Sequence, residues 1–251
     1  MGRTILMILF GFMVLCSCNE KEGDQLKIAV AANMQFAGKE LCKSFTVKTG
    51  IACDLIVGSS GQLTAQVKSG APYDVFVSAD MKYPVDLFNT GYSSARPEIY
   101  AFGKLVMWSM ADNIQPSIDI LKSNMVKHIA IANPATAPYG AAAVEVLNRH
   151  HLYEDVKSKL VYGESISQTN QFIISKSAQV GFTAKSVVLS SEMKGKGNWT
   201  DISEADYTPI AQGVVVLKHS GPHNSKAQKF YNFLFTTKAK DILRNFGYSV
   251  K

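Results

Sequence analysis

Short apolar runs alternate with amphipathic runs along the chain, and turn residues separate them. Three apolar runs near the start have the length of buried strands: 26–33, 51–57 and 73–80. Two runs with helical spacing lie between them and end at glycines: 34–50 and 61–70. The pattern predicts a β-α-β-α-β unit whose parallel sheet is covered by helices on both faces.

The alternation continues to the C-terminal end. It predicts strands at 99–110, 128–134, 159–165, 178–184 and 208–219, and helices at 82–91, 117–127, 141–156, 167–177 and 225–248. Two of these strands, 99–110 and 208–219, are long enough to cross between lobes. If both cross, residues 24–104 plus 213–251 form lobe 1, and residues 105–212 form lobe 2. We therefore expect an α/β fold with two lobes on a hinge of two crossover strands; a single doubly wound sheet is the alternative.

The first residues follow a different pattern. Arg3 precedes thirteen uncharged residues, 5–17, and a polar stretch follows Cys18. The apolar run is short for a membrane span and suits a signal peptide. Its end, LCSC, resembles a bacterial lipobox, with Cys16 at the tolerant second position. We expect a lipoprotein signal peptide at 1–17, acylation of Cys18 and a tether at 18–25, and therefore an extracytoplasmic, membrane-anchored protein.

Composition narrows the function. The chain has 251 residues, 47% of them hydrophobic, and a net charge of +6. The basic residues are scattered, which does not favour nucleic-acid binding. Export would permit a disulfide between Cys42 and Cys53, although each could equally be a small buried hydrophobe. No C-x-x-C or Cys/His spacing indicates a structural zinc site.

Four loops lead from a predicted strand into a predicted helix: 31–36, 58–63, 133–143 and 163–168. They are rich in small or neutral polar residues, and none contains Lys or Arg. Helix starts offer unpaired N–H donors and a partial positive charge. In open α/β sheets ligands lie beyond the carboxyl ends of strands, so these loops predict an anion site made of neutral donors.

The same loops lack the parts of the common catalytic sites. GSSGQL has no P-loop lysine, and Gln62 replaces the second glycine of a nucleophile elbow. None of the five histidines lies in one of these four loops, so Ser59 and Ser60 have no evident general base. Binding without turnover is favoured. A hydrolase using either serine is one alternative, and a sensory or scaffold lipoprotein is another. Taken singly, Ser59, Ser60 and Asn33 could be no more than helix caps.

Several stretches together resemble the periplasmic molybdate-binding proteins of ABC transporters. They are AVAANMQFA (29–37), GSSGQLTAQVKSGAPYDVFVSAD (58–80), GKLVMWS (103–109), IANPATAPYGAAAVEVL (131–147), GESISQTNQFI (163–173) and the closing NFGYSVK. They cover nearly all of residues 26–251 in family order. The resemblance implies a two-lobed periplasmic binding protein of type II that captures molybdate, and tungstate as well, and delivers it to an ABC permease. It implies no enzyme activity, no cofactor and a monomer.

The resemblance also implies a ligand set. Its members fall on Asn33 beside Ala32, on Ser60, on Tyr139 and on the Ile166 N–H. Some relatives have Ser in place of Asn33 and Ala in place of Tyr139, and some use a tyrosine where this chain has Ala184. We assign Ala184 no role.

The expected ligands are dianions at neutral pH, which need donors and no acceptor. Glu164 is the one charge near a donor loop. As an acceptor it would suit a protonated phosphate, whereas at a helix start it would interact with the macrodipole. Sulfate, which also carries no proton, remains an alternative that only cavity size would discriminate.

Overall fold

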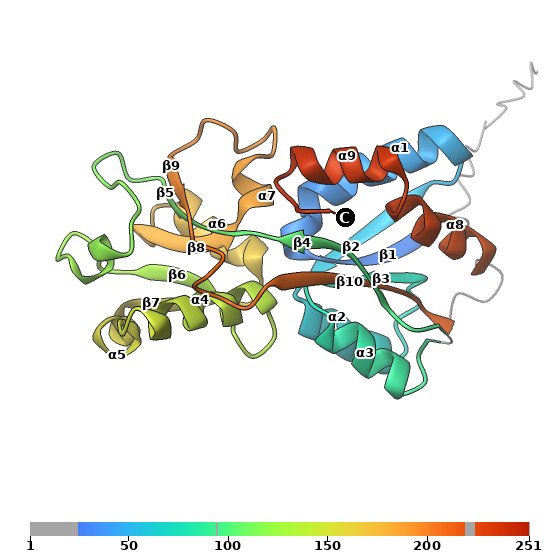
Figure 1. Cartoon of the computed structure of the whole chain (residues 1–251), viewed down its shortest axis with the longest axis horizontal. Helices are drawn as coiled ribbons and strands as arrows, with labels where there is room; N and C mark the ends of the chain where they lie inside the picture. The colour runs from blue at the N-terminus through green and yellow to red at the C-terminus, as the bar shows by residue number, and fades with distance from the viewer. Residues whose placement is uncertain (1–24, 94, 219–223, 251) are drawn as a thin grey trace, which may run out of the picture.

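The computed structural model describes residues 25–93, 95–218 and 224–250. The predicted signal peptide (1–17), the lipidation site Cys18 and all but the last residue of the tether (18–25) lie outside the described residues. Within them, two five-stranded sheets lie side by side along the long axis of the molecule (Figure 1). The strand orders are β2-β1-β3-β10-β4 and β7-β6-β8-β5-β9. The two-lobed α/β prediction is confirmed.

The first lobe comprises the following elements: β1 (Leu26–Ala31), a 3-10 turn (Ala32–Met34), α1 (Gln35–Thr49), β2 (Cys53–Gly58), α2 (Ser60–Lys68), β3 (Val75–Val77), α3 (Lys82–Asn89), β4 (Glu98–Gly103), β10 (Ile210–Val216), α8 (Asn224–Leu234) and α9 (Thr237–Asn245). The second lobe comprises β5 (Leu105–Ser109), a 3-10 turn (Asp119–Lys122), β6 (Ile129–Ala132), α4 (Pro138–Arg149), α5 (Tyr153–Val156), a 3-10 turn (Lys157–Lys159), β7 (Leu160–Gly163), α6 (Ile166–Ile174), β8 (Val180–Ala184), α7 (Lys185–Val188) and β9 (Asn198–Asp201).

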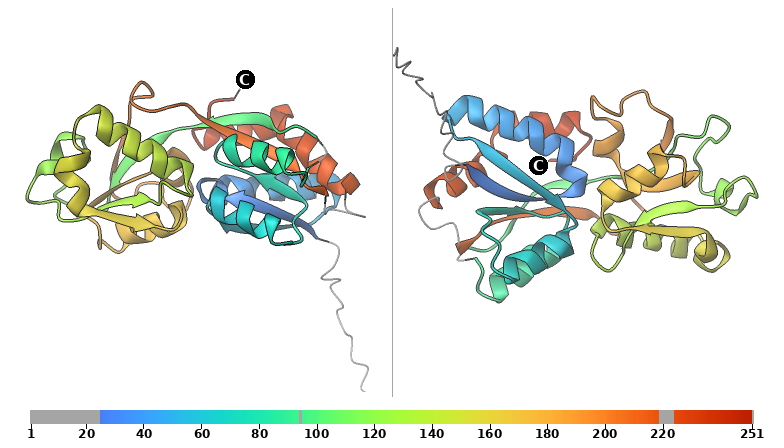
Figure 2. Two further views of the ribbon diagram at one scale, coloured as in Figure 1. Left: turned by 90° about the horizontal axis from the view of Figure 1, so that it is seen from below. Right: turned by 180° about the vertical axis from the view of Figure 1, so that it is seen from behind.

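Strand register brings the predicted loops together. β1 runs parallel to β2, with Ala31 opposite Gly58, so the chain leaves both strands at the same level. In the second sheet β6 runs parallel to β7, with Ala132 opposite Gly163. Because parallel strands end at one edge of a sheet, each lobe presents two of the four neutral loops there. Helices cover both faces of the first sheet, with α1, α8 and α9 on one side and α2 and α3 on the other (Figures 1 and 2).

Each lobe has its own apolar core. The first sheet carries clusters on its two faces, one around Phe45 and Phe230, whose rings meet edge to face 5.2 Å apart, and one around Phe76. The second lobe is built around Trp108 and Phe182, both almost fully buried. The core cluster of the second lobe extends to Ala31, Ala32 and Ala79 of the first lobe, so the lobes are in contact where the strands end.

The chain crosses between the lobes twice. The first crossing is the single residue Lys104, between β4 and β5; the second is 202–209, between β9 and β10. Each arriving strand is inserted antiparallel, β5 beside β8 and β9, and β10 beside β3 and β4. The predicted boundary 104/105 falls at the first crossing. The boundary 212/213 falls within β10, which pairs with the first sheet from Ile210 onward.

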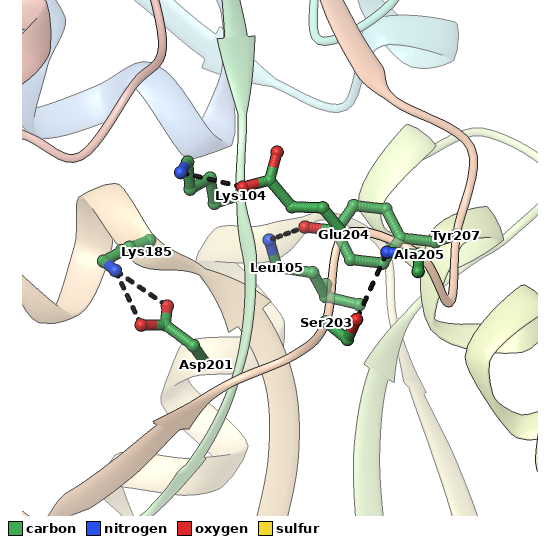
Figure 3. Close-up of polar contacts among 8 residues, drawn as sticks. All are labelled: Lys104, Leu105, Lys185, Asp201, Ser203, Glu204, Ala205 and Tyr207. Carbon is green, nitrogen blue, oxygen red and sulfur yellow. Dashed lines mark hydrogen bonds and ion pairs between the residues drawn. The ribbon is translucent and has the colours of Figure 1, made fainter.

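The two crossings are tied to each other (Figure 3). The Leu105 N–H donates to the Tyr207 hydroxyl over 3.1 Å, and Lys104 forms an ion pair of 2.8 Å with Glu204. Tyr207 is 6% exposed, whereas the Glu204 side chain is 62% exposed. Exposed ion pairs contribute little, so the buried bond of Tyr207 is the main tie.

Three sequence predictions need correction. The helix predicted at 117–127 is only a 3-10 turn that buries Leu121, because Ser123 and Asn124 interrupt the pattern before the next buried residue, Val126. β9 and α7 were not predicted. β9 is a polar, largely exposed edge strand, and α7 spans a single helical turn, so neither carries a hydrophobic period.

Cys42 on α1 and Cys53 on β2 are both free thiols in the structure, and their side chains share a hydrogen bond. That bond raises the pKa of Cys42 and lowers the pKa of Cys53. Among the described residues, no helix is both long and apolar enough to span a bilayer.

One glycine, Gly140, allows the first turn of α4 to pack closely against the end of β6. A Cβ at Gly140 would overlap the carbonyl oxygen of Ala132, which is held in the sheet. We therefore expect Gly140→Ala to lower the free energy of unfolding by about 1–3 kcal/mol. Urea denaturation measures the loss. At Gly38 in α1, a Cβ would meet only side chains at ordinary contact distance. Gly38→Ala should therefore be neutral or stabilising, and equal effects of the two changes would contradict the packing argument.

Candidate binding site

A small cavity lies where the carboxyl ends of the strands of both lobes meet. It contains about 190 Å³ of empty space, its mouth included, below the range of pockets that take drug-sized organic ligands. Its lining includes all five predicted site residues, Ala32, Asn33, Ser60, Tyr139 and Ile166, and the other lining residues are Ala31, Ser59, Ala79, Ala137 and Pro138. The lining includes no charged side chain, as the composition of the loops predicted.

Ser60 is the first residue of α2 and is 1% exposed. Its Oγ accepts a hydrogen bond of 3.0 Å from the Ala79 N–H, at the end of β3. That bond fixes the oxygen and leaves the hydroxyl proton for another acceptor. The Ser60 N–H, at the helix start, has no intrahelical partner. Ser60 therefore carries two donors suited to an anion.

The Ser59 side chain instead caps the N-terminus of α2. Its hydroxyl accepts from the Gln62 N–H over 3.3 Å, and Gln62 Oε1 accepts from the Ser59 N–H over 3.2 Å. This is a capping box, as the N-cap alternative for Ser59 predicted. The other end of the Gln62 amide donates to Glu164 Oε2 of the second lobe over 3.1 Å. Glu164 does not line the cavity. Its carboxylate instead accepts this hydrogen bond from the first lobe.

Tyr139 and Ile166 face the cavity from the second lobe. Each lies in the first turn of its helix, α4 or α6, where backbone N–H groups lack intrahelical acceptors. The Tyr139 ring reaches across to the first lobe, since a Cβ at Gly103 would overlap its hydroxyl. Burial and the nearby Tyr248 raise the pKa of Tyr139 well above its ordinary value, so it remains a neutral phenol. The Tyr139 hydroxyl thus lies against Gly103, next to the first crossing. The Tyr139 N–H is the first backbone donor of α4, because Pro138 has no N–H.

Asn33 is held by a buried polar network behind the cavity. Its Nδ2 donates to Gln212 Oε1 over 2.8 Å and to the Tyr248 hydroxyl over 2.9 Å. Its carbonyl accepts from Ser186 of the second lobe over 2.7 Å, and from Tyr248 over 3.0 Å. Both side-chain donors of Asn33 are therefore used within the protein, and Ala32 and Asn33 offer the cavity their backbone.

Sequence reasoning missed the residues of this network. Gln212 is fully buried. A glutamine in the middle of an apolar strand is visible in the sequence and could have indicated a buried polar contact. Tyr248 lies in the closing NFGYSVK stretch without an assigned role, and Ser186 gave no signal. Gln212 Nε2 donates in turn to the carbonyls of Ala79 and Ile210, so its orientation, and with it that of Asn33, is determined.

Comparison with known proteins agrees with this architecture. The family described as bacterial extracellular solute-binding protein matches residues 26–249. The molybdate-binding protein of Rhodobacter capsulatus is 39% identical, over 98% of this chain and 95% of its own length. The molybdate-binding protein of Azotobacter vinelandii is 36% identical, over 98% of this chain and 97% of its own length. The periplasmic molybdate-binding protein of Azotobacter vinelandii also has a solved structure, which superposes with a TM-score of 0.85 at 33% identity, covering 90% of this chain and all of the other.

These relatives are solute-binding transport proteins and not enzymes, which confirms the expectation of binding without turnover. The match spans both lobes and the cavity between them. This chain therefore belongs to the family of bacterial extracellular solute-binding proteins.

Proposed function

We propose that this protein captures molybdate outside the cytoplasm as the substrate-binding subunit of an ABC transporter. The observation that carries the proposal is the small cavity, which helix starts of both lobes line and no charged side chain enters. Ser60 supplies its hydroxyl and N–H, and Ala32, Asn33, Tyr139 and Ile166 supply backbone donors. The molybdate-binding relatives from two bacteria support the same ligand.

The donor set suits a fully deprotonated tetrahedral dianion. Such an ion accepts hydrogen bonds at every oxygen and donates none, and the partial positive charges of the helix starts balance it. Tungstate has the same charge and shape, so we propose that it binds as well. Sulfate is a smaller ion of the same charge, and cavity size is the feature that would reject it.

Phosphate is a second candidate, because one observation favours it. Asn33 Oδ1 is buried and has no hydrogen-bond partner among the described residues. A protonated phosphate could donate to that acceptor, whereas molybdate could not. Against phosphate, Glu164 is bound to Gln62 and does not line the cavity, so no carboxylate is at hand to accept a second proton.

Transport requires a membrane partner. The proposed cycle closes the lobes on the anion and passes it to an ABC permease, and no covalent step is needed. We propose that acylation of Cys18 anchors the monomer to the membrane, with 18–25 as a tether. The lipobox-like LCSC and the family membership support this part of the proposal.

Titration calorimetry of residues 19–251 against molybdate, tungstate, sulfate and phosphate tests the ligand. We expect binding of the first two and at least about a hundredfold weaker binding of the others, equivalent to about 2.7 kcal/mol. Selective binding of phosphate would favour the second candidate. If none of the four anions binds, the proposed function is wrong.

Ser60→Ala tests the assignment of the main donor. Removing one hydrogen bond to a dianion should weaken molybdate binding by about 1–3 kcal/mol. Ser69→Ala, at the exposed opposite end of the same helix, is the matched control and should bind like the wild type. An unchanged affinity of Ser60→Ala would remove this hydroxyl from the site.

Cys18→Ala tests the anchor. Because only a cysteine at this position could be acylated, the variant should lose lipid labelling and leave the membrane fraction. Cys16→Ala is the matched control, since that residue would be removed with the signal peptide. Palmitate labelling and fractionation of cells that express each variant give the answer, and labelling of Cys18→Ala would refute the lipobox interpretation.

A further inference from the structure

Beside the cavity, the two lobes touch through a contact that includes no proposed ligand donor. The Gly61 N–H of the first lobe donates to the Thr136 carbonyl of the second over 2.9 Å. The Tyr83 hydroxyl donates to the adjacent Ala135 carbonyl over 3.0 Å. We call these two hydrogen bonds the clasp. They join the starts of α2 and α3 to the loop between β6 and α4.

Gly61 makes the clasp possible because it has no side chain. Gly61 is the second residue of α2, where helix geometry leaves the N–H without an intrahelical acceptor. A Cβ there would come 2.8 Å from the Tyr83 hydroxyl and 3.0 Å from both Cα and Cβ of Thr136. The Tyr83 hydroxyl can rotate away, but the Thr136 backbone can move only with its lobe. A larger residue at this position would therefore keep the lobes apart at the clasp.

The clasp lies next to the proposed ligand donors in sequence and in space. Gly61 directly follows Ser60, and Thr136 directly precedes Ala137, which lines the cavity. Besides the Ser186–Asn33 bond described above, further inter-lobe hydrogen bonds near the cavity run from Gln62 to Glu164 over 3.1 Å and from Ser167 to Gln35 over 2.7 Å. Unlike these side-chain pairs, the Gly61 bond is between main chains, which fixes how closely the lobes approach.

We infer that Gly61 and Tyr83 determine the affinity for the anion without touching it, by holding the lobes together. This inference rests on the proposed function. Contacts that exist only when the lobes are together favour the liganded form by their full differential free energy, so breaking them weakens binding of every anion that the cavity accepts. Ser60 would differ in this respect, because its contribution depends on the ligand oxygen that it contacts.

The test compares three variants of residues 19–251 with the wild type. Gly61→Ala should weaken molybdate binding by about tenfold or more, because it breaks both clasp bonds. Tyr83→Phe removes one bond without adding bulk and should weaken binding by about three- to tenfold. Gly38→Ala makes the same chemical change as Gly61→Ala on α1, where there is room for the methyl group, and should bind like the wild type.

Two measurements separate the clasp from a general loss of structure. The thermal midpoints of unliganded Gly61→Ala and Gly38→Ala should stay at the wild-type value or above, since alanine suits a helix. That of Tyr83→Phe should stay at the wild-type value, because the inference places its hydrogen bond in the closed form. Small-angle scattering with saturating molybdate should give Gly61→Ala a larger radius of gyration than Gly38→Ala. Adding Tyr83→Phe to Gly61→Ala should cause little further loss, because the second bond is already broken.

The outcomes distinguish this inference from the proposed function. If the wild type binds molybdate and Gly61→Ala binds equally well, the clasp inference is wrong and the function stands. If the wild type binds none of the four anions, the function is wrong, and the clasp inference, which rests on it, is wrong as well. If molybdate binds but the radii of Gly61→Ala and Gly38→Ala with saturating molybdate are equal, the clasp inference is wrong.

Discussion

The rest of the structure depends on one constraint: each of the two crossings leads directly into a strand that lies inside the sheet of the other lobe. β5 leaves the first lobe and is hydrogen-bonded between β8 and β9, and β10 returns to lie between β3 and β4. Separating the lobes would break the ladders on both sides of each strand, leaving many backbone groups unpaired in the cores. The lobes can therefore rotate about the crossings but cannot drift apart, and the four strand-to-helix loops always face one another.

The cavity that results has no charged residue in its lining, and under the proposed function its specificity depends on how the proposed donors are held. The Ser60 side chain is oriented by Ala79 and the Asn33 side chain by Gln212 and Tyr248, so both residues are fixed by hydrogen bonds within the protein. Donors that are already oriented lose little freedom when an anion arrives. The buried tyrosines Tyr139 and Tyr248 stay neutral because burial raises their pKa, which keeps negative charge away from the cavity.

Local patterns in the sequence were sufficient to predict much of this. The first three strands, their helices, the Gly50 stop in the left-handed conformation, and the convergence of four neutral loops follow from period, turn chemistry and the geometry of parallel sheets. The resemblance supplied the ligand class and the candidate residues.

The network behind Asn33 could not be predicted in the same way. Gln212 and Tyr248 lie 179 and 215 residues from Asn33, and a side-chain hydrogen bond over that separation leaves no periodic trace. β9 escaped prediction because an exposed edge strand needs no apolar alternation. The lobe contact at Gly61 escaped as well, since a glycine in a turn reads as a conformational need and not as a place where two lobes meet.

The bond between Leu105 and Tyr207 has a consequence for the entropy of the molecule. Because it joins the two crossings at one level, it opposes independent twisting of the two segments and so restricts the relative motion of the lobes. A chain with few open arrangements loses little conformational entropy when it closes. Under the proposed function, more of the free energy of the anion contacts would then appear as affinity, and a hydroxyl outside the cavity lining would contribute to how tightly the cavity holds its ligand.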